Sequence, residues 1–129
     1  MLRYLSAEWI DALDAAAQED AALASATGRV ALVIQQEVTG GPDGDVVWHV
    51  AVDHGSVRFL PGPAEAPDVT FQQDHATALA VGRGEQSAQT AFMIGKLRVG
   101  GDVGLLLEHQ DAFGAVDDVF AAVRADTEI

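Results

Sequence analysis

The hydrophobic period of this 129-residue chain changes near residue 30, and that change limits the folds open to it. Before it, Trp9, Leu13 and Ala16 recur at helical spacing, and Ser6 stands where an N-cap is expected. After it, apolar and polar residues alternate from Val30 onward, which is typical of half-buried strands. The chain therefore combines helices with a sheet.

Alternating runs predict five strands. The first three lie within residues 30–38, 46–52 and 57–59, and the short turns between them predict an antiparallel meander. Three prolines follow between residues 61 and 67, where we expect an extended crossing segment, because proline does not fit a central strand. The fourth strand is expected around Val69 and Phe71, and a short fifth one at residues 96–99.

The remaining segments predict helices. Asp74 and Ser87 are expected to cap short helices at residues 76–81 and 88–94, and Asp102 a further one. A longer amphipathic helix ends the chain. This order predicts an α+β fold, in which one mixed sheet carries its helices on one face.

Composition narrows the class of protein. The length argues for a single domain over residues 1–129. A net charge of −13 argues against a nucleic-acid partner, because phosphates need clustered cations, and against anionic membrane surfaces. The chain has no cysteine, no signal-like start and no apolar run near the about 20 residues of a membrane span. We therefore expect a cytoplasmic protein without stable membrane insertion.

Catalytic signatures are missing. The sequence holds no dinucleotide-binding, P-loop, zinc-protease or nucleophile-elbow motif. Its four histidines fall on four different predicted elements, so no metal site and no cofactor are expected. An enzyme with one buried carboxylate as base is an alternative; Asp102 is the nearest candidate, although capping accounts for that residue.

Apolar side chains gather between residues 81 and 99, on two glycine-ended helices and a strand. Short helices of this kind suit the lining of a cleft, and an unbranched methionine gives such a lining a deformable wall. An ordinary core produces the same pattern, so both interpretations stay open. The residues are Val81, Phe92, Met93, Ile94, Leu97 and Val99.

Residues 91–102, AFMIGKLRVGGD, resemble the hallmark segment of the sterol carrier protein family, the type-two lipid-transfer domain. The segments VGLLL at 103–107 and APDVTF at 66–71 are similar to the same family, and LSAEW at 5–9 resembles the start of its bacterial members. The resemblance implies a hydrophobic tunnel between a five-stranded sheet and the helices, which binds sterols, fatty acids or acyl thioesters without catalysis. It places Phe92, Met93, Ile94, Leu97, Leu106 and Leu107 along the tunnel, and Gln110 near its polar end.

We therefore expect this chain to carry a lipid or sterol-like molecule. Lys96 and Arg98 share the face of the fifth strand opposite Leu97, so few cations would meet the phosphates of an acyl-CoA, and a neutral or singly charged lipid is expected. The alternative is an accessory or dimerisation module with a filled tunnel. In that case the apolar stripe of the last helix docks on a partner or a second copy, unless it covers its own core. The stripe consists of Phe113, Val116, Phe120 and Val123.

Overall fold

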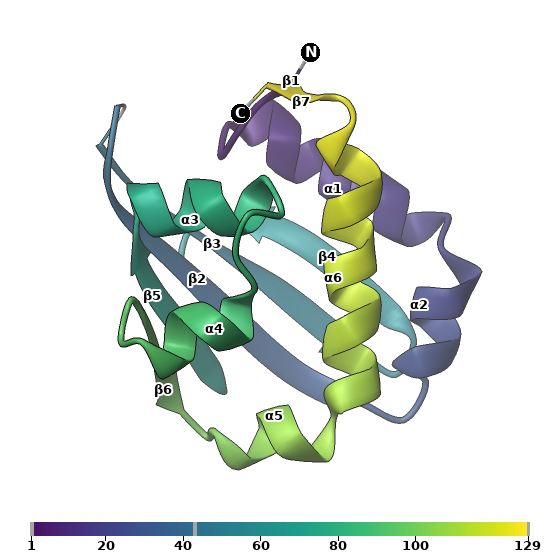
Figure 1. Ribbon diagram of the computed structural model, residues 1–129. Coiled ribbons are helices and arrows are strands. Elements are labelled where there is room, and N and C mark those ends of the chain that lie inside the picture. Colours follow the sequence, from purple (N-terminus) through teal and green to yellow (C-terminus); the bar gives the residue numbers. More distant parts are fainter. Residues whose placement is uncertain (1, 43, 129) are drawn as a thin grey trace.

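A mixed five-stranded sheet forms one layer of the molecule (Figure 1). The computed structural model describes residues 2–42 and 44–128. The strand order is β4-β3-β2-β5-β6, which confirms the predicted α+β class and strand number. The strands are β2 (Ala31–Gly41), β3 (Gly44–Asp53), β4 (Ser56–Pro61), β5 (Val69–Asp74) and β6 (Leu97–Gly101).

Strands β2, β3 and β4 form the predicted antiparallel meander, and the segment at residues 62–68 then carries the chain back to the far side of β2. There β5 pairs with β2 in parallel and with β6 antiparallel. The backbone N–H of Asp68 donates to the carbonyl of Val33 at 2.9 Å, and that of Ala64 donates to the Gln35 side chain at 3.0 Å. These bonds fix the crossing segment against β2.

The helices form the second layer and lie on one side of the sheet (Figure 1). Two further strands of two residues each, β1 (Leu2–Arg3) and β7 (Thr127–Glu128), pair in parallel and bring the two ends of the described chain together. Runs this short carry no alternation, so the sequence does not predict them. The helices are α1 (Ala7–Gln18), α2 (Ala21–Ala26), α3 (His75–Gly82), α4 (Ala88–Met93), α5 (Gly104–Glu108) and α6 (Gln110–Arg124).

Three predicted N-caps are confirmed. The side chains of Ser6, Asp74 and Ser87 each accept a hydrogen bond from the backbone N–H three residues on, at 3.2, 2.8 and 3.0 Å. Each bond satisfies a donor that the first helical turn cannot use. The starts of α1, α3 and α4 are therefore encoded locally.

The predicted cap of α5 is wrong. Val103, not Asp102, is the N-cap residue; its backbone is already helical, and no side-chain cap bond is described there. The Asp102 N–H donates to the Asp68 carbonyl at 2.8 Å, and the Asp102 carbonyl accepts from Leu105 at 3.1 Å. The main chain of Asp102 thus joins the residue before β5 to the first turn of α5, and its side chain is exposed.

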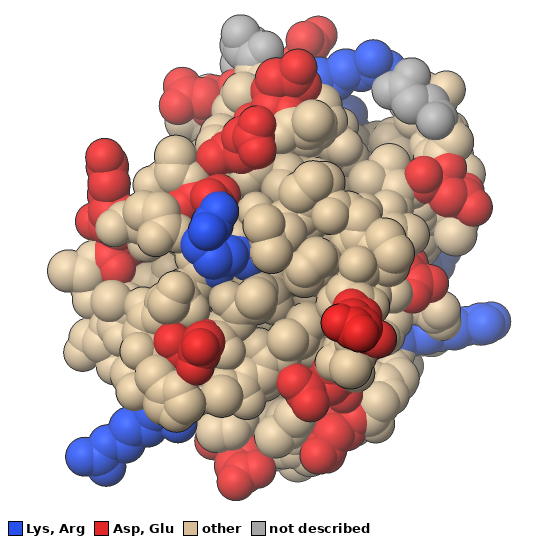
Figure 2. Space-filling model, turned by 180° about the vertical axis from the view of Figure 1, so that it is seen from behind, with Lys and Arg blue, Asp and Glu red and all other residues tan. Residues whose placement is uncertain are grey.

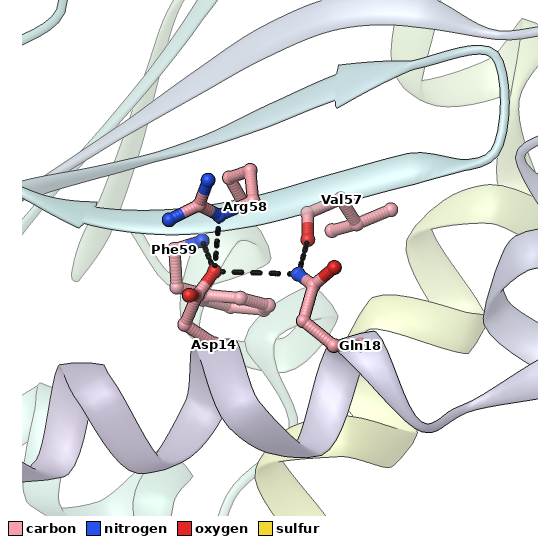
Figure 3. Close-up of polar contacts among 5 residues, drawn as sticks. All are labelled: Asp14, Gln18, Val57, Arg58 and Phe59. Atoms are coloured by element: carbon pink, nitrogen blue, oxygen red, sulfur yellow. Dashed lines mark hydrogen bonds and ion pairs between the residues drawn. The ribbon is translucent and has the colours of Figure 1, made fainter.

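Helix α1 is clasped to the edge strand β4 (Figure 3). Asp14 Oδ1 accepts from Arg58 Nε at 2.9 Å and from the Phe59 N–H at 3.0 Å. Gln18 Nε2 donates to the Val57 carbonyl at 2.8 Å and lies 3.5 Å from Asp14 Oδ1. Side chains of α1 thus satisfy backbone groups that an edge strand would otherwise offer to another chain.

Aromatic rings fill the core between the β3–β4 half of the sheet and helices α1 and α6. Trp9 and Trp48 meet edge to face with ring centroids 5.5 Å apart, and Phe120 of α6 touches both. Val116 and Val123, from the same predicted stripe of α6, are buried. The stripe therefore covers the core of its own chain.

Candidate functional site

The helices cover the sheet unevenly. On the helix-facing side of β3 and β4, every residue from Trp48 to Phe59 is at most 4% exposed: Trp48, Val50, Val52, Val57 and Phe59. On β5 and β6, by contrast, Val69 and Leu97 are buried but Phe71, Gln73 and Val99 are only half-buried. Gln36 of the central strand β2 is half-buried as well. We call these four residues the open half of the sheet.

The helices next to the open half carry exposed apolar side chains. Helix α4 lies beside β6, and α5 follows β6 in the chain (Figure 1). Residue Met93 at the end of α4 is 76% exposed, and Leu107 of α5 is 75% exposed. None of the side chains of α5, residues 104–108, is buried. Among residues 2–42 and 44–128, the large exposed apolar residues are Phe92, Met93, Ile94, Val103 and Leu107.

The nine residues predicted to contact a ligand fall into three groups. Leu97 is buried beneath the helices. Val81 of α3, Val99 of β6 and Leu106 of α5 are half-buried. The rest are exposed, and among them the structure brings Leu107 and Gln110 to one recess. The exposed group is Phe92, Met93, Ile94, Leu107 and Gln110.

That recess, of about 360 Å³, lies where α5 meets α6 and opens to solvent. It is lined by Ala26, Val30 and residues 107–112, of which four carry polar or charged side chains. A lipid site is expected to be mainly apolar, so this lining does not match one. A smaller recess of about 70 Å³ lies between Tyr4, Val46 and His75.

Three residues of the open half are not predicted as site residues from the sequence: Gln36, Phe71 and Gln73. Phe71 was expected in a strand, but its alternation does not say which face stays uncovered. The ring of Phe71 meets that of Phe113 of α6 at 6.5 Å, which places it on the helix side. The sequence does carry a signal for the two glutamines, since Gln36 interrupts a series of apolar residues two apart and Gln73 ends another.

Charged side chains stay off the helix-facing surface of the sheet. At the helix-facing positions within residues 32–38, 46–52, 57–59, 69–73 and 97–99 there is no Lys, Arg, Asp or Glu. Arg98 pairs in register with Gln72 on the opposite surface. Figure 2, seen from behind the sheet, shows acidic groups scattered over this face and few basic ones. The open half is therefore polar only through its glutamines.

Two ionisable groups near α3 have shifted pKa values. Hydrogen bonds from Thr77 hold the pKa of the Asp74 cap below its usual range. Burial raises the pKa of Tyr4 to about 12, and its hydroxyl donates to the Ala78 carbonyl at 3.0 Å. Both groups bind helix α3: Asp74 caps its first turn, and Tyr4 joins it to the N-terminal segment.

Other kinds of site find little support in the described residues. Among them no cluster of three or more His, Asp or Glu side chains could hold a metal ion. Asp102, the candidate base, is exposed rather than enclosed by apolar side chains. No helix within residues 2–42 and 44–128 combines the length and apolarity needed to cross a bilayer.

Comparison with known proteins identifies the family. The model of the SCP-2 sterol transfer family matches residues 10–114. Sterol carrier protein 2 of Bos taurus is 34% identical over 76 residues, which are 58% of this chain but only 14% of that protein. A solution structure of a conserved protein from Thermus thermophilus shares the fold with a TM-score of 0.76, at 21% identity over 95% of this chain and 91% of the other. A crystal structure of sterol carrier protein 2 gives a TM-score of 0.75, at 22% identity over 91% and 96% of the two chains. This chain belongs to the SCP-2 sterol transfer family.

Proposed function

We propose that this chain binds a lipid without covalent chemistry, and that the apolar body of the lipid lies between the open half of the sheet and the apolar side chains of α4 and α5. The uneven cover of the sheet carries this proposal. One half is packed with aromatic rings, whereas the other keeps Phe71 and Val99 half-buried beside helices that carry exposed apolar side chains. Membership of a family named for sterol transfer supports a ligand of this class.

Burial of the lipid supplies the binding energy. Each methylene removed from water contributes about 0.8 kcal/mol, so twelve methylenes give roughly 10 kcal/mol before the cost of association. Phe71 and Val99 of the floor and Met93 of the wall offer the apolar surface against which that burial occurs. The expected affinity is therefore micromolar with weak selectivity for chain length.

The charge pattern favours a neutral or singly charged lipid over an acyl-CoA. The phosphates of an acyl-CoA need several cations, and the floor of the open half has none. Lys96 and Arg98 are exposed and alternate with Leu97, so Arg98 belongs to the opposite surface of β6. We infer that the protein acts as a carrier and not as an enzyme, because the exposed Asp102 lacks the enclosed setting that a buried base requires.

Substitution of Met93 by glutamate tests the proposal. Met93 is so exposed that the change should leave folding within about 0.5 kcal/mol, but it puts a charge against the lipid. We expect Met93→Glu to lower the affinity for unlabelled lipid about tenfold, the equivalent of about 1.4 kcal/mol. The affinity is measured by displacement of a fluorescent sterol. Gln89→Glu, on an exposed position of the same helix, adds the same charge and should bind as the unmodified chain does. Equal affinity of the Met93→Glu variant would remove α4 from the lipid site, and a chain that binds no sterol or fatty lipid would refute the proposed function.

A further inference from the structure

Gln36 interrupts the apolar helix-facing surface at the centre of the sheet. Its register partner on β3 is Trp48, whose ring meets Trp9 of α1. Its partner on β5 is Phe71, whose ring meets Phe113 of α6. Paired residues of neighbouring strands project to the same face of a sheet, so the Gln36 side chain faces the helices.

Gln73 faces the same way. It pairs in register with Val38 of β2 and Leu97 of β6, both of which are buried beneath the helices. It stands two residues beyond Phe71, the partner of Gln36, so the two glutamines are diagonal neighbours across β2 and β5. Neighbouring strands lie about 4.8 Å apart and each residue advances a strand by about 3.3 Å, so the two positions are roughly 8 Å apart, within reach of two long side chains for one small group between them.

The hydrogen bonds of the outer glutamines show what is unusual about this pair. On the opposite surface, Gln35 Nε2 donates to Glu37 Oε2 at 2.7 Å, and Gln72 Nε2 donates to Glu37 Oε1 at 3.0 Å. Within residues 2–42 and 44–128, the side chains of Gln36 and Gln73 have no such protein partner. The buried indole N–H of Trp48, next to Gln36, also lacks one in that part of the chain. The amide atoms of Gln36 and Gln73 are not among the fully buried polar atoms, so they stay accessible and have bonding capacity to offer a ligand.

We propose that Gln36 and Gln73 together hold the uncharged polar end of the bound lipid, and that the site selects a hydroxyl over a carboxylate. This inference rests on the proposed function. A primary amide both donates and accepts, as a hydroxyl does, so each glutamine can bond a lipid alcohol in either sense. A carboxylate would lie on a surface without any cation to compensate its desolvation. The lipid therefore lies with its hydroxyl at the floor and its body toward Val99 and the α4–α5 side.

Two ligands of equal chain length test the selection. Dodecan-1-ol and dodecanoate differ only in their polar end, and each is titrated against a bound fluorescent sterol on the full chain at a pH where the acid is ionised. The unmodified protein should bind the alcohol at least tenfold more tightly. Gln36→Leu and Gln73→Leu, which keep side-chain size, should each weaken alcohol binding about three- to tenfold, the effect of one neutral hydrogen bond, and leave acid binding unchanged.

Gln72→Leu is the matched control, because Gln72 neighbours Gln73 in sequence but projects from the other surface. It should bind both ligands as the unmodified chain does. Equal affinity for alcohol and acid, or alcohol binding that neither Gln36→Leu nor Gln73→Leu weakens, overturns this inference while lipid binding stands. If the unmodified chain binds neither the sterol probe nor the two dodecyl ligands, the proposed function itself fails. Circular dichroism of each variant shows that a loss of binding is not a loss of fold.

Discussion

Alkaline pH should destabilise this protein through Tyr4, the single tyrosine of the chain. Its hydroxyl donates to the Ala78 carbonyl of α3 at 3.0 Å, and its ring meets Trp9 edge to face with centroids 5.0 Å apart. Burial raises the pKa of Tyr4 from 10.0 to about 12. The folded chain therefore favours the protonated, neutral form of this half-buried tyrosine.

The sign and size of the effect follow from that shift. Below pH 10 the tyrosine is protonated in both folded and unfolded chains, so the full stability is present. Between pH 10 and about 12 only the unfolded chain loses the proton, and the free energy of unfolding falls. Two pH units correspond to about 3 kcal/mol in total, a large part of the stability of a domain this size.

The near-ultraviolet absorbance of tyrosinate measures the ionisation, since tryptophan does not titrate in this range. The folded chain should ionise with a midpoint near 12, or together with unfolding if the chain unfolds first, and the urea-unfolded chain with a midpoint near 10. Tyr4→Phe should abolish the absorbance change and flatten the alkaline loss of stability. A midpoint near 10 in a chain whose circular dichroism stays native would refute the reasoning.

Two further substitutions test the fold. Gly101 has φ +83°, and a Cβ there would overlap the Asp68 carbonyl oxygen, so Gly101→Ala should lower the free energy of unfolding by more than about 2 kcal/mol. Gly100→Ala, which meets nothing within 4 Å, should change it by less than about 0.5 kcal/mol; equal urea midpoints for the two variants would contradict the steric argument. Asp14→Ala leaves the Phe59 N–H without its acceptor and should cost about 1–3 kcal/mol, part of which Asp14→Asn should restore. An unchanged urea midpoint for Asp14→Ala would show that the α1–β4 clasp adds no stability.

Local signals explain why most of the fold is readable from the sequence. A hydroxyl or carboxylate before an apolar run set the starts of α1, α3 and α4, because the bond from Ser6, Asp74 or Ser87 closes within three residues. The alternation in β2 and β3 survives because one face of each is buried. The start of α5 was mispredicted, because the helix begins one residue later, at the N-cap Val103, without a side-chain cap bond.

The candidate site was less predictable, for a different physical reason. At the end of α4, a helix of six residues, Phe92, Met93 and the C-cap residue Ile94 are all apolar. Three consecutive apolar residues do not indicate which side chain faces the sheet. The family resemblance points to these residues as ligand contacts but does not indicate how exposed each of them is. Gln36 and Gln73 become neighbours only through the parallel pairing of β2 with β5, which joins segments separated by the whole of β3 and β4. No local pattern encodes that pairing.

Native mass spectrometry of the freshly purified chain tests the central claim most directly. We expect a species heavier than the bare chain by the mass of one lipid, which disappears on solvent extraction and returns when a sterol or a long-chain alcohol is added. A chain that is bare after purification, and that takes up neither ligand well above micromolar concentration, would contradict it.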